Sequence, residues 1–244
     1  MGGGLAILII SSTAVFIAIR LGHIAPEKVE VDVVDYELGW REDFTDTVRS
    51  GKNILPSNWR LRGKPGTPIS VFEVVPGVKD GTGILQVRSD SASGTIVTLA
   101  ENVDLDATPV LRWRWRVSEL PAEADGRVAA RDDQAIGIYI GDGSLFNNKS
   151  VAYRWDTEAP VNSEGTSVYG LGTVNVKWYT LRNSGDPKGE WFTEKRNFLE
   201  DFKEAWGEAP RKVYVGITSN SQYTASTAEA ELDWIEFISA EKQK

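Results

Sequence analysis

The chain has 244 residues with a formal net charge of -8, no cysteine and a single histidine, His23. The negative charge argues against a nucleic-acid partner, because binding to phosphates needs clustered positive charge. The absence of cysteine excludes disulfide bridges and thiolate chemistry, and one histidine excludes a Ser-His-Asp triad and multi-histidine metal sites. We therefore expect no metal, no other cofactor and no enzymatic activity.

The N-terminal segment is apolar enough to cross a membrane. Residues 2–19 form a run of 18 residues without a charge, which as a helix would be about 27 Å long, close to the thickness of the hydrocarbon layer. We predict a single transmembrane helix within residues 1–24. Its anchoring side chains are Leu5, Ile9, Val15, Phe16 and Ile19. A cleaved signal peptide is the alternative, but no basic residue precedes the run and no A-x-A site follows it.

The remainder divides into a juxtamembrane linker over 25–40, with a short strand around Val29–Val34, and a globular domain over 41–244. The domain shows short alternating runs separated by glycine and proline turns, a pattern typical of an all-β sandwich or barrel. The predicted strands are Ile69–Val75, Ile84–Arg88, Thr95–Leu99, Leu111–Val117, Ala135–Ile140, Val151–Trp155, Val174–Leu181, Val213–Thr218 and Glu229–Ile238. The nine tryptophans predict an aromatic core, an aromatic surface, or both.

One helix is predicted from Phe198 to Trp206. Asn197 is a suitable N-cap, Gly207 supplies a left-handed stop, and apolar rings recur at helical spacing on one face. We expect these rings to pack against the sandwich.

The segment Leu111–Val117, with the sequence LRWRWRV, is the most informative in the chain. A period of two sends its apolar side chains into the core and places Arg112, Arg114 and Arg116 in a row on the outer face. In the next strand, Asp133 and Tyr139 lie on the outer side. If the two strands are neighbours, these five side chains form a shallow polar groove for a ligand.

A plainer interpretation is that the three arginines pair with acids on adjacent strands, such as Asp133, Asp156 or Glu231. Such pairs are common on sheet faces. Asp132 and Asp133 do not make a catalytic pair, because neighbours on a strand point to opposite faces, whereas a glycosidase needs two carboxylates facing one site.

Five stretches resemble domain-of-unknown-function family 3047. They are LRWRWRVSELP, DDQAIGIYIGDG, VAYRWD, EKRNFLEDFKEAWGEAP and the terminal VYVGITSNS…AEAELDWIEF. The resemblance covers about Trp59 to Phe237 and implies a bacterial, exported protein with a jelly-roll-like sandwich and no established activity. It therefore implies a globular domain on the periplasmic side of the inner membrane, an orientation that the charges flanking the helix do not decide.

Three functional hypotheses follow from these features. The first is a non-enzymatic accessory subunit of a bacterial membrane complex, for example photosynthetic or respiratory, that contacts other subunits and the lipid bilayer. The alternative is a membrane-tethered carbohydrate-binding module that holds a glycan on the outer arginine and tyrosine face. A glycan-cleaving enzyme acting through carboxylates is a third and weaker hypothesis.

Overall fold

The computed structural model describes residues 36–77, 81–143 and 148–240. The predicted membrane anchor, with Leu5, Ile9, Val15, Phe16 and Ile19, and the predicted strand around Val29–Val34 lie outside the described residues. Within the described part of the chain, no helix is long and apolar enough to span a membrane.

The described residues contain fifteen strands, one α-helix and two short 3-10 helices. The strands are β1 (Leu38–Glu42), β2 (Thr47–Ser50), β3 (Asn53–Pro56), β4 (Arg60–Gly63), β5 (Val71–Pro76), β6 (Gly83–Asp90), β7 (Ser93–Leu99), β8 (Val110–Glu119), β9 (Gln134–Gly141), β10 (Asn148–Trp155), β11 (Glu164–Tyr169), β12 (Val174–Arg182), β13 (Phe192–Asn197), β14 (Tyr214–Asn220) and β15 (Thr227–Ile238). The helices are η1 (Ala129–Arg131), η2 (Gly170–Gly172) and α1 (Phe198–Trp206).

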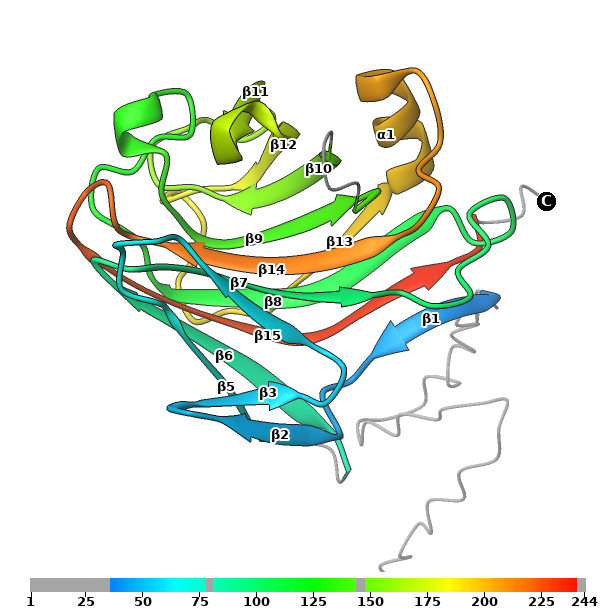
Figure 1. Cartoon of the computed structure of the whole chain (residues 1–244), viewed down its shortest axis with the longest axis horizontal. Helices are drawn as coiled ribbons and strands as arrows, with labels where there is room; N and C mark the ends of the chain where they lie inside the picture. Colours follow the sequence, from blue (N-terminus) through cyan, green and yellow to red (C-terminus); the bar gives the residue numbers. More distant parts are fainter. Residues whose placement is uncertain (1–35, 78–80, 144–147, 241–244) are drawn as a thin grey trace, which may run out of the picture. The chain divides into compact units, whose positions relative to one another are not determined.

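The strands form two sheets that enclose a common core (Figure 1). The first sheet has the order β13-β8-β15-β6-β5-β3-β2, and β1 pairs with β15; the second has the order β11-β12-β10-β9-β14-β7-β4. β15 is long enough to pair with β8 along one side and with β6 and then β1 along the other. The predicted all-β sandwich with one short helix is confirmed.

The core is aromatic, as the tryptophan count suggested. Trp113 and Trp115 of β8 are fully buried and make an edge contact at a centroid distance of 5.4 Å. Trp113 also stacks on Tyr153 of β10, in the opposite sheet, at 5.2 Å. Such ring pairs add specific geometry to the apolar area that the sandwich buries.

Helix α1 begins and ends where the sequence predicts. The side chain of Asn197 accepts a hydrogen bond from the Glu200 backbone N–H at 3.2 Å, and Gly207 closes the helix with φ at 76°. Phe198 and Phe202 are buried in the core, so the predicted packing of the helix rings against the sandwich is confirmed.

Candidate functional site

The arginine row on the outer face of β8 lies beside a row of acids on the adjacent strand β15. The Arg112 Nε donates to Glu236 Oε1 at 2.6 Å, and the Arg114 Nη1 donates to Asp233 Oδ2 at 2.6 Å. Arg116 forms its ion pair with Glu231. Pairing with acids on a neighbouring strand is therefore confirmed, with Glu231 the one partner named from the sequence.

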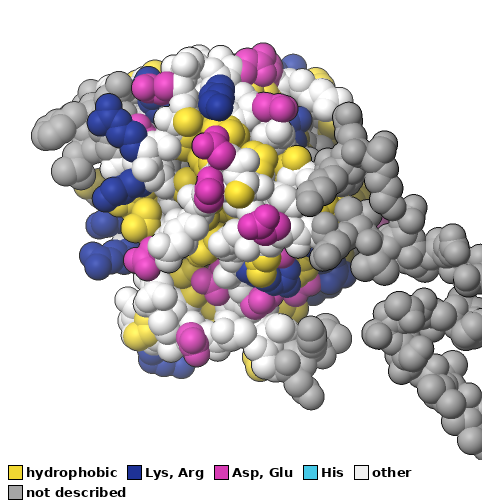
Figure 2. All heavy atoms as spheres, turned by 90° about the vertical axis from the view of Figure 1, so that its right-hand side faces the viewer, with side chains coloured by type: hydrophobic (Ala, Val, Ile, Leu, Met, Phe, Trp, Pro, Cys, Tyr) yellow, Lys and Arg dark blue, Asp and Glu magenta, His cyan; other side chains and the backbone are white. Residues whose placement is uncertain are grey.

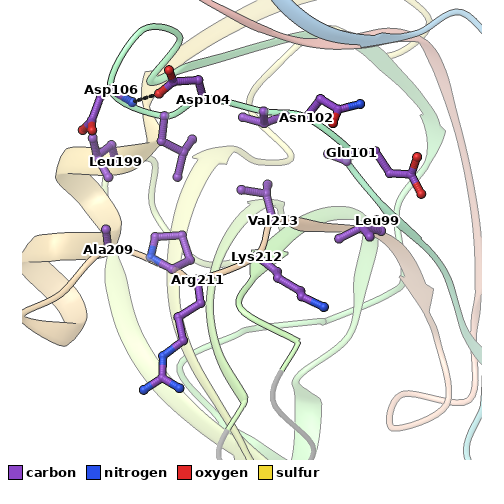
Figure 3. Close-up of a pocket in the computed structure, with 14 residues that line it drawn as sticks. Leu99, Glu101, Asn102, Asp104, Asp106, Leu199, Ala209, Arg211, Lys212 and Val213 are labelled. Carbon is purple, nitrogen blue, oxygen red and sulfur yellow. Dashed lines mark hydrogen bonds between the residues drawn. The ribbon is translucent and has the colours of Figure 1, made fainter.

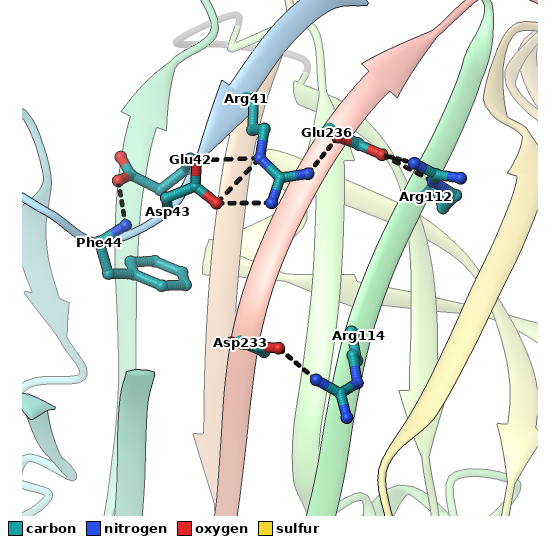
Figure 4. Close-up of polar contacts among 8 residues, drawn as sticks. All are labelled: Arg41, Glu42, Asp43, Phe44, Arg112, Arg114, Asp233 and Glu236. Atoms are coloured by element: carbon teal, nitrogen blue, oxygen red, sulfur yellow. Dashed lines mark hydrogen bonds and ion pairs between the residues drawn. The ribbon is translucent and has the colours of Figure 1, made fainter. Parts of the chain in front are cut away.

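Strand β1 brings a fourth arginine to the same face (Figure 4). The guanidinium of Arg41 donates to both carboxylate oxygens of Asp43 and forms an ion pair with Glu236. Hydrogen bonds to Asp43, and then to Glu236, hold the pKa of Arg41 above its usual value despite partial burial. Glu236 is only 3% exposed, so its ion pairs with the arginines offset the cost of burying its carboxylate.

Two half-buried tryptophans cover the arginines. The Trp191 ring lies over the guanidinium groups of Arg114 and Arg116, with centroid distances of 4.9 and 4.5 Å. The Trp234 ring lies over those of Arg41 and Arg112, at 4.9 and 5.2 Å. Contacts of this kind attract the cation to the ring and orient both groups.

The tryptophans and charged pairs border a groove of about 690 Å³ on the outer face of the first sheet. Its lining residues are Arg41, Asp43, Thr82, Ile84, Arg114, Trp191, Asp233 and Trp234. The groove has the size of a small-molecule site, and it combines apolar ring surface with a few polar groups, as such sites do. Arg114 is the member of the predicted row that lines it.

Asp133 and Tyr139 do not join this groove, and the predicted arrangement of five side chains is wrong in that respect. β9 belongs to the second sheet, between β10 and β14, whereas β8 lies between β13 and β15 in the first. The segment between β8 and β9 crosses from one sheet to the other instead of closing a hairpin. Trp191 and Trp234 take the places that the prediction gave to an acid and a tyrosine.

Asp133 is buried and forms hydrogen bonds with the backbone of a turn. Its side chain is fully buried, and its Oδ2 accepts hydrogen bonds from the backbone N–H groups of Tyr223 and Thr224 at 2.9 and 2.8 Å. Burial raises the pKa of Asp133 although these bonds favour the charged form. The carboxylate thus holds the turn between β14 and β15.

Tyr139 and the other aspartate of the pair belong to a buried polar cluster on the outer face of the second sheet. Arg154 is fully buried; its Nη1 donates to Asp132 Oδ1 at 2.7 Å and its Nη2 to the Tyr169 hydroxyl at 2.9 Å. Burial opposes the charge of Arg154, but the neighbouring phenols and carboxylate raise its pKa above the usual value. Burial likewise raises the pKa of Tyr139.

A second open groove, of about 640 Å³, lies at one end of the sandwich between the segments 99–106 and 209–213 (Figure 3). Leu99, Val213 and Leu199 provide apolar surface, and the rim carries acids on the first segment and Arg211 and Lys212 on the second. Figure 2, seen from the right-hand side of Figure 1, shows acidic side chains dispersed among apolar and uncharged ones. The polar side chains of this second groove do not form a cluster of paired charges like the one in the groove between Trp191 and Trp234.

The fold and the groove define the chain as a two-sheet β-sandwich protein with a charged, tryptophan-flanked groove on one outer face. Residues 58–236 match the family described as "Protein of unknown function (DUF3047)", and the chain belongs to this family. The resemblance predicted from about Trp59 to Phe237 is confirmed. Arg114, Trp191, Asp233 and Trp234 all lie within the matched residues.

No curated protein matches the chain. Among solved structures, the conserved carbohydrate esterase vb_24B_21 from Shiga toxin-encoding bacteriophage phi24B is similar with a TM-score of 0.46 and 14% identity, over 84% of this chain and 99% of that one. The family 11 carbohydrate-binding module of the cellulase Lic26A-Cel5E of Clostridium thermocellum has a TM-score of 0.44 and 10% identity, over 87% and 99% of the two chains. These similarities are too distant to bear on the function.

Proposed function

We propose that the domain is a non-catalytic carbohydrate-binding module whose ligand lies in the groove between Trp191 and Trp234. The observation that carries the proposal is that two tryptophan rings line the same groove as the Arg114–Asp233 ion pair, on the outer face of the first sheet. A sugar presents an apolar ring face and a polar rim, and this groove offers a matching surface for each.

The polar groups of the groove are already positioned. Asp233 accepts from Arg114 through Oδ2, which leaves its second oxygen to accept from a sugar hydroxyl. Because the partners lie on adjacent paired strands, binding would not require ordering a loop around the charged groups.

Both groove carboxylates, Asp43 and Asp233, form ion pairs with arginine. A glycosidase needs two carboxyl groups that are free to act on the scissile bond, whereas each of these two is engaged by a guanidinium group. This arrangement supports binding in preference to hydrolysis.

The experiment that tests the proposal is a glycan array, followed by calorimetry with the ligands it finds. We expect Trp191→Ala and Trp234→Ala each to weaken binding by about tenfold or more, because buried aromatic contacts carry most of the affinity at such sites. Tyr223→Ala is the matched control, because Tyr223 is an exposed aromatic residue that lines neither groove. No glycan response by the wild-type protein would refute the proposal, and so would full affinity in both tryptophan variants.

The predicted membrane anchor lies before Tyr36, the periplasmic location is what the family resemblance implies, and the partner subunits are expected to contact both the anchor and the sandwich. They remain predictions, and the binding proposal does not depend on them.

A further inference from the structure

The two ends of the groove differ in how far their arginine donors are satisfied. At the Trp234 end, the Arg41 Nε, Nη1 and Nη2 all donate to Asp43 or Glu236. Arg112 in turn gives both its Nε and its Nη2 to Glu236. This end therefore offers a ligand few spare hydrogen-bond donors.

At the Trp191 end the arginines keep most of their donors. Arg114 donates through Nη1 alone, to Asp233, and Arg116 through Nε alone, to Glu231. Among the described residues no other acceptor meets these two guanidinium groups, and both side chains remain partly exposed, at 39% and 33%. Figure 4 shows the hydrogen bond from Arg114 to Asp233.

The free edge of Arg114 has the geometry that carboxylates accept. With Nη1 engaged, its Nε–H and Nη2–H remain as a parallel pair of donors, which binds both oxygens of a carboxylate. Two other arginines of the chain bind a carboxylate through their own Nε and Nη2 atoms. Arg127 holds Asp125 through Nε and Nη2 at 2.9 and 2.8 Å, and Arg196 holds Asp201 through the same atoms at 2.9 and 2.6 Å.

We propose that the groove selects acidic glycans, with the carboxylate of a uronic-acid residue bound by the free edge of Arg114 at the Trp191 end. This inference rests on the proposed carbohydrate binding and names the class of sugar. Trp191 keeps the guanidinium in place by lying over it, so the two donors face the ligand without the loss of side-chain entropy that a free arginine would incur. A neutral sugar can offer these donors only hydroxyl and ring oxygens, which carry no negative charge to strengthen the hydrogen bonds.

The test compares matched ligands, namely oligogalacturonates and oligoalginates, each beside the same oligosaccharide with its carboxyl groups reduced to hydroxymethyl groups. We expect the wild-type domain to bind the acidic member of a pair at least about tenfold more tightly. We expect this preference to fall as salt is raised, because part of it is electrostatic.

Arg114→Gln should lower the acidic-to-reduced affinity ratio to about one, because it removes the charged pair of donors that the carboxylate would use. Arg114→Lys keeps the charge but loses the parallel donors, so its acidic-to-reduced affinity ratio should lie between those of the wild type and Arg114→Gln. Arg88→Gln is the control, since Arg88 is an exposed arginine of the same sheet that pairs with Glu73 outside the groove.

The outcomes separate the two proposals. Equal wild-type affinity for both members of each pair overturns the acidic selectivity and leaves carbohydrate binding intact. An unchanged ratio in Arg114→Gln overturns the assignment to Arg114. Binding to neither member, together with a silent glycan array, overturns the proposed function itself.

Discussion

Arg114 and Arg154 show how the position of a strand decides what an arginine does. Both point to the outer face of a sheet, but Arg114 is 39% exposed and keeps free donors, whereas Arg154 is fully enclosed. Arg154 is held by Asp132 and Tyr169, and its guanidinium also lies 5.3 Å from the centroid of the Trp178 ring. Ligand binding is our proposal for Arg114, and we expect Arg154 to stabilise the fold.

The buried pair of Arg154 with Asp132 leads to a prediction on stability. Arg154→Leu should lower the free energy of unfolding by about 3–5 kcal/mol, because it leaves the Asp132 carboxylate buried without its cation. The measurement is urea unfolding followed by tryptophan fluorescence. Arg88→Leu, in an exposed ion pair, should cost no more than about 1 kcal/mol. Equal losses in the two variants would contradict this account.

At the scale of the element, helix α1 and the strands differ in how completely the sequence predicts them. The helix is delimited by local signals, the side chain of Asn197 and the left-handed Gly207, and both act within a few residues of the helix ends. The nine predicted strands are all present. Six further strands were missed, namely β1, β2, β3, β4, β11 and β13. They are four to six residues long and several are polar, so hydrophobic alternation over so short a run is a weak signal.

The C-terminal cap of α1 gives a prediction that separates backbone strain from packing. Apart from its chain neighbours and the backbone of its own helix, no atom of the described residues lies within 4 Å of the position that a Cβ on Gly207 would occupy, yet its φ is 76°. Gly207→Ala should therefore lower the free energy of unfolding by about 1 kcal/mol through conformation alone. Gly207→Asn should lose less, since asparagine tolerates the left-handed region. Chemical denaturation measures both, and an alanine variant as stable as the wild type would argue against the cap.

At the scale of the whole molecule, the first described strand completes both the sandwich and the groove. β1 begins at Leu38, before the domain start predicted at residue 41, and pairs with the end of β15. Its Trp40 packs near Phe237, with a centroid distance of 6.4 Å, and its Arg41 meets the buried Glu236. The N-terminal edge of the domain is thus tied to its C-terminal strand.

This arrangement predicts the effect of removing β1. A fragment over 44–240 should have a lower Tm than a fragment over 36–240, by roughly 6–12 °C for a loss of about 3 kcal/mol. The reason is that Phe237 loses an aromatic neighbour and Glu236 loses one of its two arginines. Differential scanning calorimetry gives the comparison, and Trp40→Ala and Arg41→Gln in the longer fragment separate the two contributions. Identical Tm values would show that β1 is dispensable.

The fold class, the helix with its caps, the faces of β8 and the family could all be inferred from the amino-acid sequence. Each of these depends on signals that act over neighbouring residues: a period of two along a strand, a cap at a helix end, a run of motif residues. The outward row of Arg112, Arg114 and Arg116 is one such result, and so is the inward row of Trp113 and Trp115.

The neighbours of that row could not be inferred in this way, because they depend on the order of the strands in the sheet. Strand order depends on pairing between distant segments. The connection from β8 to β9 crosses between the sheets, so Asp133 and Tyr139 lie with the second sheet and not beside the arginine row. β15 and the loop before β13 instead bring Asp233, Trp234 and Trp191 to Arg114 from 77 to 120 positions away in the chain. No local sequence pattern predicts that these four residues lie together, because their proximity results from burying the apolar faces of both sheets at once.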